Sequence, residues 1–260
     1  MTSIYDWFGY ELPVNERYRL IKEAGFDGVL LWWSDGFGRD GLGQNDYRNG
    51  PQIAREAGLF IENIHTPVKN QNKLWLDNLE GETLTDCYLQ CVEDCVEFEI
   101  PTMVVHLPDE DNPYNILGLD RIKRIIEKAE QFGVNVAMEN LRNLTNLAYV
   151  LEQIDSQRIG FCYDCGHHYH YYPDIELLSM YGSRLMALHL HDDGGKYNQH
   201  RLPFDGTIDW STAMKNIANT GYSGATAIEA MNWDYQNLSV KEFLQEAFKR
   251  AKRLEAFRII

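Results

Sequence analysis

The chain has 260 residues, 44% of them hydrophobic, and a formal net charge of −15. This acidity disfavours nucleic acid as a partner, because binding to nucleic acid needs clusters of Lys and Arg that displace counterions from phosphate. No apolar run reaches the length of a signal peptide or a membrane span, so we expect a soluble cytoplasmic protein without a membrane partner. No linker-like segment divides the chain, and its length is typical of one α/β barrel domain, here 1–260.

Short apolar runs rich in β-branched residues recur along the chain, and segments with a helical pattern separate them. The runs are 3–8, 26–33, 59–65, 102–107, 135–141, 158–164, 185–191 and 225–231. Strands that alternate with helices predict parallel βαβ units. Eight such units predict a closed (β/α)₈ TIM barrel.

The clearest helix predictions are 15–25, 113–133 and 239–257. The first two finish at Gly25 and Gly133, as helices with a C-terminal glycine do. An open doubly wound sheet is the alternative fold, but it would need a GxGxxG turn after the first strand, and the sequence has none. The Gly-rich segment 37–46 opens no obvious helix and is expected to be a loop.

Residues with reactive side chains gather where the predicted strands end. They are His65, His106, Glu139, Asp164, His189, His191 and Glu229, with His167 three residues beyond Asp164. The C-terminal ends of barrel strands share one face, which carries the active site, so these side chains are expected to converge. A lone His at a strand end is commonly a hydrogen-bonded rim residue. A Glu inside an apolar run, however, is costly unless it is paired or metal-bound.

The combination of these groups predicts a metal site. Imidazole and carboxylate ligands suit Mn²⁺, Zn²⁺, Fe²⁺ or Co²⁺, with Mg²⁺ as a further option and Ca²⁺ disfavoured. The sequence does not choose among the first four ions.

Cysteines are expected to be structural rather than ligating. Cys162 and Cys165 form a Cys-x-x-Cys pair, but no second thiolate pair completes a zinc site. Cys162 also falls inside a predicted strand rather than at a helix N-terminus, where a redox pair would lie. The other three, Cys87, Cys91 and Cys95, are spaced as one stripe of a helix and predict core packing.

Aromatic residues at or just beyond strand ends are expected to line a carbohydrate site, because sugars stack their C–H faces on such rings. The principal candidates are Trp7, Trp32, Trp33 and Trp233, with Phe8 and Tyr235 beside them. Packing at the rim is the alternative for each. The aromatic run after His167, which contains His168 and His170, is expected to form a loop above the site or an oligomer contact.

Five short motifs, in their order and spacing, resemble the xylose isomerase-like TIM barrel superfamily over nearly the whole chain. They are MEN (138–140), YDCGH (163–167), HLHD (189–192), HRLPFDGTIDW (200–210) and IEA (228–230). This superfamily includes sugar isomerases and epimerases of the tagatose and psicose 3-epimerase type, hydroxypyruvate and inosose-pathway enzymes, and DNA repair enzymes of the endonuclease IV type.

The resemblance implies that Glu139, Asp164, His189 and Glu229 are metal ligands. His189 is preferred over His191 because Asp192 completes the family pattern of a ligand, two residues and an acid, although both histidines point to the same side of the strand. The resemblance further implies that His167 contacts substrate oxygens.

The chain also departs from the family patterns. Thr145 stands where tagatose-type epimerases carry a second acid, and Lys196 is the residue nearest to an expected Arg. The endonuclease-like members bind three metals, and His65, His106, His167 and His200 fit this larger ligand set. Asn198, however, replaces an acid of that set. These four histidines, His191 and Lys196 are therefore additional candidates for metal or substrate binding.

These observations predict a metal-dependent isomerase or epimerase of a sugar, sugar phosphate or sugar acid. The metal would stabilise an enediolate, while Glu139 and Glu229 remove and return a proton on carbon. Bases on two faces would invert the centre, whereas one base used twice would isomerise. The alternatives are a multi-metal phosphodiester hydrolase and a non-catalytic sugar-binding barrel. The exact substrate and a homo-oligomeric state stay open.

Overall fold

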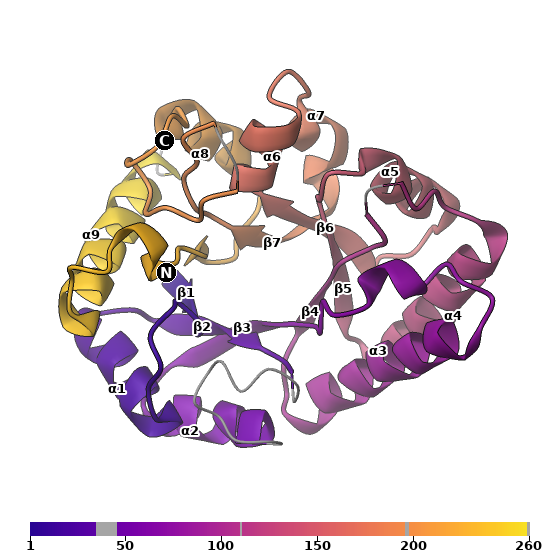
Figure 1. Ribbon diagram of the computed structural model, residues 1–260, viewed down its shortest axis with the longest axis horizontal. Coiled ribbons are helices and arrows are strands. Elements are labelled where there is room, and N and C mark those ends of the chain that lie inside the picture. Colours follow the sequence, from indigo (N-terminus) through magenta and orange to yellow (C-terminus); the bar gives the residue numbers. More distant parts are fainter. Residues whose placement is uncertain (35–45, 110, 196–197, 259–260) are drawn as a thin grey trace.

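The computed structural model describes residues 1–34, 46–109, 111–195 and 198–258, and it shows a ring of parallel strands surrounded by helices (Figure 1). The strands are β1 (Thr2–Tyr5), β2 (Gly28–Trp32), β3 (Phe60–His65), β4 (Thr102–Val105), β5 (Asn135–Glu139), β6 (Ile159–Asp164), β7 (Leu185–His189) and β8 (Thr226–Ile228). They pair in the order β7-β6-β5-β4-β3-β2-β1-β8, and a parallel bridge between Leu190 and Ile228 joins the two ends. The predicted (β/α)₈ TIM barrel is therefore confirmed.

Helices connect the strands and cover the outside of the barrel. They are α1 (Val14–Ala24), α2 (Gly50–Glu56), α3 (Leu79–Glu97), α4 (Ile116–Phe132), α5 (Leu144–Gln153), α6 (Cys165–Tyr171), α7 (Leu177–Tyr181), α8 (Trp210–Asn219) and α9 (Val240–Arg258). The three helices predicted from the sequence are α1, α4 and α9. Gly25 and Gly133 follow α1 and α4 with φ of 111° and 77°, a left-handed conformation that glycine adopts without steric penalty.

Apolar side chains form two separate layers. The larger layer lies between the strands and the surrounding helices, and Cys91 and Cys95 of α3 are buried in it, as their spacing predicts. The smaller layer is a cluster of Val104, Ala137, Cys162 and Ala187. Because residues of a barrel strand alternate between inside and outside, these short side chains fill the interior beneath the strand ends. Among the described residues, no helix combines the length and apolarity that a membrane span requires.

Two segments for which a loop was expected are the Gly-rich segment and the aromatic run after His167. The Gly-rich segment 37–46 lies outside the described residues, apart from Asp46 at the start of a short 3₁₀ helix (Asp46–Asn49). The aromatic run after His167 lies in helix α6 rather than in a loop, and the alternative of an oligomer contact stays a prediction. Asp164 caps this helix, because its side chain accepts a hydrogen bond from the backbone N–H of His167 at 2.7 Å.

Candidate metal and active site

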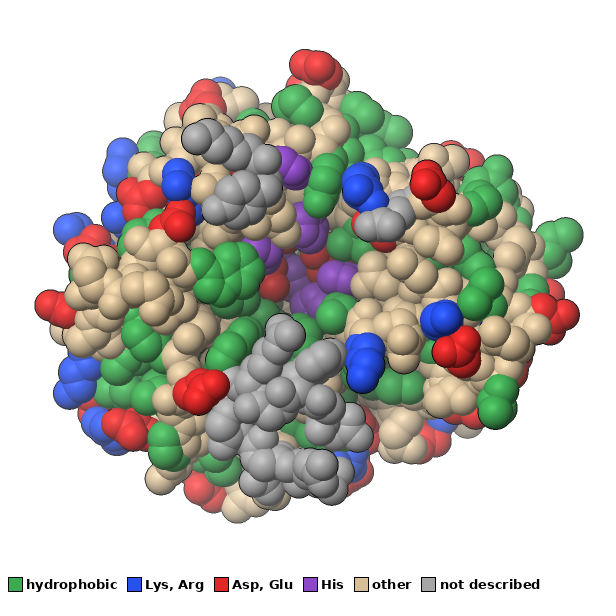
Figure 2. All heavy atoms as spheres, in the orientation of Figure 1, with side chains coloured by type: hydrophobic (Ala, Val, Ile, Leu, Met, Phe, Trp, Pro, Cys, Tyr) green, Lys and Arg blue, Asp and Glu red, His purple; other side chains and the backbone are tan. Residues whose placement is uncertain are grey.

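The C-terminal ends of the strands surround a hollow, and Figure 2 shows histidine and acidic side chains at its floor. The cavity has a volume of about 310 Å³. Its walls are Tyr5, Trp7, Trp32, His65, Val68, His106, Glu139, His167, Asn198, His200, Glu229, Met231 and Trp233. The barrel therefore brings together residues that are far apart in the sequence.

Glu139, at the end of β5, is the centre of the polar cluster and is only 2% exposed. Its Oε2 lies 3.1 Å from Nε2 of His106 and 3.4 Å from Nε2 of His65. The same oxygen lies 3.1 Å from Nδ1 of His189, and Oε2 of Glu229 lies 3.1 Å from that nitrogen as well. Two buried carboxylates thus approach one imidazole nitrogen.

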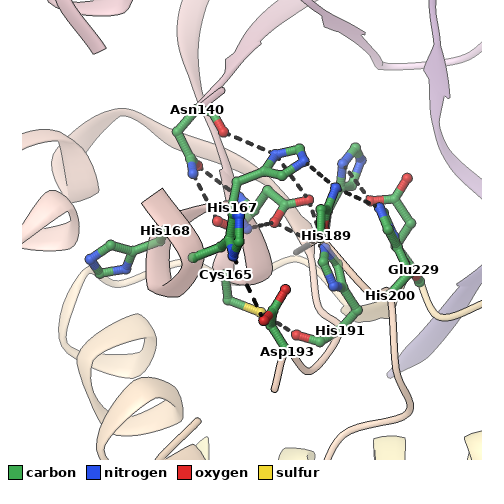
Figure 3. Close-up of polar contacts among 12 residues, drawn as sticks. Asn140, Cys165, His167, His168, His189, His191, Asp193, His200 and Glu229 are labelled. Carbon is green, nitrogen blue, oxygen red and sulfur yellow. Dashed lines mark hydrogen bonds and ion pairs between the residues drawn. The ribbon is translucent and has the colours of Figure 1, made fainter. Parts of the chain in front are cut away.

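Asp164, at the end of β6, forms the second half of the cluster. Its carboxylate lies 3.1 Å from Nε2 of His191 and 3.5 Å from Nδ1 of His167. Nδ1 of His167 also lies 3.2 Å from Oε1 of Glu139, so His167 connects the two carboxylates. Figure 3 shows His167, His189, His191, His200 and Glu229 converging from their separate elements. His189 and His191, which were the two competing ligand candidates, both lie in the cluster.

Burial alone would raise the pKa of each of these carboxylates, but the imidazoles around them outweigh it. His106 and His189 hold the pKa of Glu139 well below its usual range. His167 and His191 lower the pKa of Asp164, and His189 lowers that of Glu229. All three acids are therefore ionised at neutral pH.

The histidines respond in opposite ways. Burial lowers the pKa of His106, and burial together with His191 lowers that of His200 to about 4. For His167, Asp164 and Glu139 outweigh the effect of burial and raise the pKa to about 9. His167 is therefore a hydrogen-bond donor at neutral pH, whereas His200 stays neutral.

Outer contacts fix the orientation of several rings, as is usual around metal sites. Nδ1 of His65 lies 3.0 Å from the carbonyl oxygen of Thr66, and Nδ1 of His106 lies 3.0 Å from Oε1 of Gln71. If both Nδ1 atoms carry the proton, the Nε2 lone pairs face Glu139. Asn140 lies next to Glu139 in the chain, and its amide exchanges two hydrogen bonds of 2.8 Å with the backbone of Asp164.

Asn198 occupies the gap between two imidazoles. Its Nδ2 lies 2.9 Å from Nε2 of His167 and 3.1 Å from Nε2 of His200. The ring of His200 in turn stacks on that of His191 with centroids 3.9 Å apart. An amide nitrogen therefore stands where an acid was expected to complete a third metal position.

The cluster has the donor set of a cation site. Several groups of three side chains place their ligand atoms within 4.8 Å of one another, among them His65, His106 and Glu139, and Glu139, Asp164 and His167. The carboxylates of Glu139, Asp164 and Glu229 are buried, with exposed fractions of 2%, 0% and 5%. No Lys or Arg of the described chain lines the cavity to balance its carboxylates. These features fit a divalent ion.

Of the tryptophans that were expected to line the site, some lie in the cavity wall and one does not. Trp7 and Trp32 line the cavity, and Trp233 stands at its mouth, 52% exposed. Trp33 was expected to line the site but does not: it packs on the outside of β2, and its Nε1 donates to Asp94 of α3 at 2.7 Å. The reason is strand alternation, which cannot turn the consecutive residues Trp32 and Trp33 to the same side. Lys196 lies outside the described residues.

Two residues next to predicted ligands are structural. His168 hydrogen-bonds to the hydroxyl of Tyr163 and the carbonyl oxygen of Ile175, both at 2.7 Å. The thiol of Cys165 donates to the carbonyl oxygen of His191 at 3.1 Å. Sequence reasoning overlooked Tyr5, Val68 and Met231 in the cavity wall, and Gln71 behind His106. Of these, only Tyr5 carried a usable signal, since it is spaced by two from Trp7.

Asp192 supports the loop above the site rather than the cavity. Its carboxylate accepts hydrogen bonds from Phe204 N at 2.8 Å, Ile208 N at 3.2 Å and Trp210 Nε1 at 2.6 Å.

We expect Asp192→Ala to lower the free energy of unfolding by about 3 kcal/mol or more, because these donors lose a charged acceptor. Urea denaturation measures the change. Glu80→Ala, at an exposed pair with Lys73, is the control and should alter stability by under about 0.5 kcal/mol. Equal stability of the Asp192 variant and the wild type would contradict this role.

The chain is 27% identical to the uncharacterized protein y4fM of Sinorhizobium fredii (strain NBRC 101917 / NGR234), over 97% of this chain and 93% of the relative. It is 22% identical to fructoselysine 3-epimerase of Shigella flexneri, over 97% of each protein.

Solved structures share the fold. A D-tagatose 3-epimerase-like protein superposes with a TM-score of 0.76 at 19% identity, covering 98% of this chain and 96% of its own. The IolI protein, solved with a bound zinc atom, superposes with a TM-score of 0.75 at 14% identity, covering 99% and 97%. The sequence model of one family, described as xylose isomerase-like TIM barrel, matches residues 18–255. The chain therefore belongs to the xylose isomerase-like TIM barrel family.

Proposed function

We propose that the protein is a divalent-metal-dependent isomerase or epimerase of a sugar or sugar derivative. The observation that carries the proposal is the pair of buried carboxylates, Glu139 and Glu229, whose oxygens each lie 3.1 Å from Nδ1 of His189 at the floor of an aromatic-walled cavity. The relatives support this choice, because they include sugar epimerases and isomerases.

In this proposal Glu139, Asp164, His189 and Glu229 hold the ion. Their carboxylates and imidazole suit Mn²⁺, Zn²⁺, Co²⁺ or Fe²⁺, and Mg²⁺ is compatible. The zinc atom in IolI, a protein of the same fold, supports such an ion. When bound, it polarises the carbonyl of the substrate as a Lewis acid.

The protein supplies binding and proton transfer. Trp7, Trp32 and Trp233 offer faces on which a sugar ring can stack. Glu139 and Glu229 are ionised, and each carboxylate has two oxygens, so one oxygen can bind the ion while the other accepts a proton from carbon. His167 lines the cavity and donates a hydrogen bond to a substrate oxygen. Two bases acting on opposite faces would epimerise, and one base acting twice would isomerise.

The partner is a small carbohydrate, and the acidic chain is not directed at nucleic acid. All five cysteines are free, which suits the reducing cytoplasm. Assembly into a homo-oligomer remains a hypothesis that size-exclusion chromatography with light scattering can test.

Metal content is the test of the proposed function. Protein purified without chelator is analysed by elemental mass spectrometry, and we expect one divalent ion per chain. The loaded protein is then incubated with a panel of ketoses and sugar acids in deuterated water, and NMR detects exchange of a carbon-bound hydrogen. A chain that binds no divalent ion, even after metal is added, would contradict the proposal and favour a non-catalytic sugar-binding barrel.

A multi-metal phosphodiester hydrolase is the second candidate. It is favoured by the additional groups of ligand atoms, His65 with His106 and Glu139, and His191 with His200 and Glu229. Asn198 opposes it, because its Nδ2, a hydrogen-bond donor, lies 3.1 Å from Nε2 of the neutral His200, whose lone pair a third ion would need. Two or three ions per chain would favour this candidate and direct assays to phosphodiesters, including abasic DNA.

A further inference from the structure

Cys162 lies directly beneath the cluster, although its sequence context suggested a structural role. It is 0% exposed and precedes Asp164 by two residues on β6, so both side chains point to the same side of the strand. In the pairing of β5 with β6, Cys162 stands opposite Glu139. Its neighbours in the interior are Val104, Ala137 and Ala187, none of which offers a polar contact.

Three different ligand atoms meet at this point. The sulfur of Cys162, a carboxylate oxygen of Glu139 and a ring nitrogen of His189 all lie within 4.8 Å of one another. Bonds of about 2.0–2.3 Å to a tetrahedral ion place its ligand atoms about 3.3–3.8 Å apart, so small side-chain shifts would bring these three atoms onto one ion.

His189 connects this sulfur to the carboxylates. Its ring is 0% exposed and hydrogen-bonds to the thiol of Cys162. Its Nδ1 lies 3.1 Å from a carboxylate oxygen of Glu139 and from one of Glu229. A thiol, an imidazole and an ionised carboxylate that are packed together in this way are the ligand types that bind a Zn²⁺-like ion.

We propose, building on the metal-dependent function above, that the floor of the site is a deeper metal position in which Cys162 joins Glu139 and His189 to hold a thiophilic divalent ion of the Zn²⁺ or Co²⁺ type. On coordination the S–H bond breaks, a metal–sulfur bond forms and the proton leaves to solvent. Mn²⁺ and Mg²⁺ prefer oxygen ligands, so they stay at the position above, with Glu139, Asp164, His189 and Glu229.

This position gives the site a basis for discriminating between ions. A thiolate adds affinity for Zn²⁺, Co²⁺ and Cd²⁺ and little for Mn²⁺ or Mg²⁺. Loss of the sulfur is therefore expected to weaken binding of the first group by about tenfold or more, and to leave Mn²⁺ binding within about twofold.

Cobalt substitution tests the proposal, because Co²⁺ reports its ligands by colour. The intact protein is loaded with Co²⁺, and its spectrum is compared with those of Cys162→Ser and Cys165→Ser. We expect visible d–d bands in all three proteins. A sulfur-to-cobalt charge-transfer band in the near ultraviolet should appear in the wild type and in Cys165→Ser, and should be absent from Cys162→Ser. Cys165 is the matched control, because it is equally buried but bonds to the backbone of His191.

The outcomes separate this proposal from the one on which it rests. Visible bands without charge transfer in the wild type would overturn the role of Cys162 and leave the metal centre standing. Failure of Co²⁺ to bind at all would overturn the proposed metal-dependent function as well. If the band were lost in Cys165→Ser but kept in Cys162→Ser, the sulfur ligand would be Cys165, and the proposal would be overturned. If Cys162→Ser does not fold, cadmium NMR of the wild type tests the proposal instead. A thiolate ligand shifts the cadmium resonance far downfield, and a resonance without this shift would contradict the role of Cys162.

Discussion

Replacing either Glu139 or Glu229 with glutamine is expected to reduce turnover by about 100-fold to 10,000-fold, which is the usual contribution of a general base. The amide keeps the shape of the side chain but cannot accept a proton from carbon. Both carboxylates are buried and have lowered pKa values, so each is ionised and available as a base in the native protein.

The measurement is the rate of exchange of a carbon-bound hydrogen with deuterated water, with the substrate found in the ketose panel. Circular dichroism and metal content of each variant separate loss of the base from loss of fold or ion. Glu97→Gln, at the exposed C-terminal end of α3, is the control and should keep full activity. A double variant of Glu139 and Glu229 that still turns over would contradict the two-base mechanism.

Removing the imidazole of His189 is expected to weaken metal binding by about 100-fold or more, whereas removing that of His191 should have a smaller effect. Nδ1 of His189 lies 3.1 Å from both Glu139 and Glu229, whereas the ion-pair contact of His191 within the described residues is with Asp164. The two alanine variants are matched, because both parent residues are fully buried and two positions apart.

Isothermal titration calorimetry with Mn²⁺ measures the dissociation constant of each variant. Mn²⁺ is used because it is not expected to bind the sulfur of Cys162. Unfolding in urea shows whether a variant is destabilised rather than merely unable to bind the ion. If His191→Ala lost the ion and His189→Ala retained it, the ligand would be His191, and the site would be centred on Asp164.

Much of the fold could be predicted because its elements carry their own local signals. Apolar runs separated by amphipathic segments identify each strand of the barrel, and Gly25 and Gly133 mark helix ends by their left-handed conformation. The strands are shorter than predicted; for example, β8 covers only 226–228 of the expected 225–231. Apolar composition continues beyond the last backbone pairing, so it does not locate where a strand stops.

Helix α6 escaped prediction because its signal is ambiguous. It has only seven residues, among them several aromatic rings with modest helix propensity. Asp164 looks like a site residue in the sequence, and it is also the N-cap that starts this helix. One side chain therefore serves both the local structure and the candidate site.

The sequence by itself determined the class of fold and the chemical types of the candidate site, since strand periodicity and the acids and histidines at strand ends are local properties. Only the tertiary structure decided which atoms meet. It turned Trp33 outward, placed the amide of Asn198 between His167 and His200, and brought the thiol of Cys162 to His189. These contacts join residues from different strands, helices and loops. Their distances depend on how the barrel closes, which no local pattern encodes.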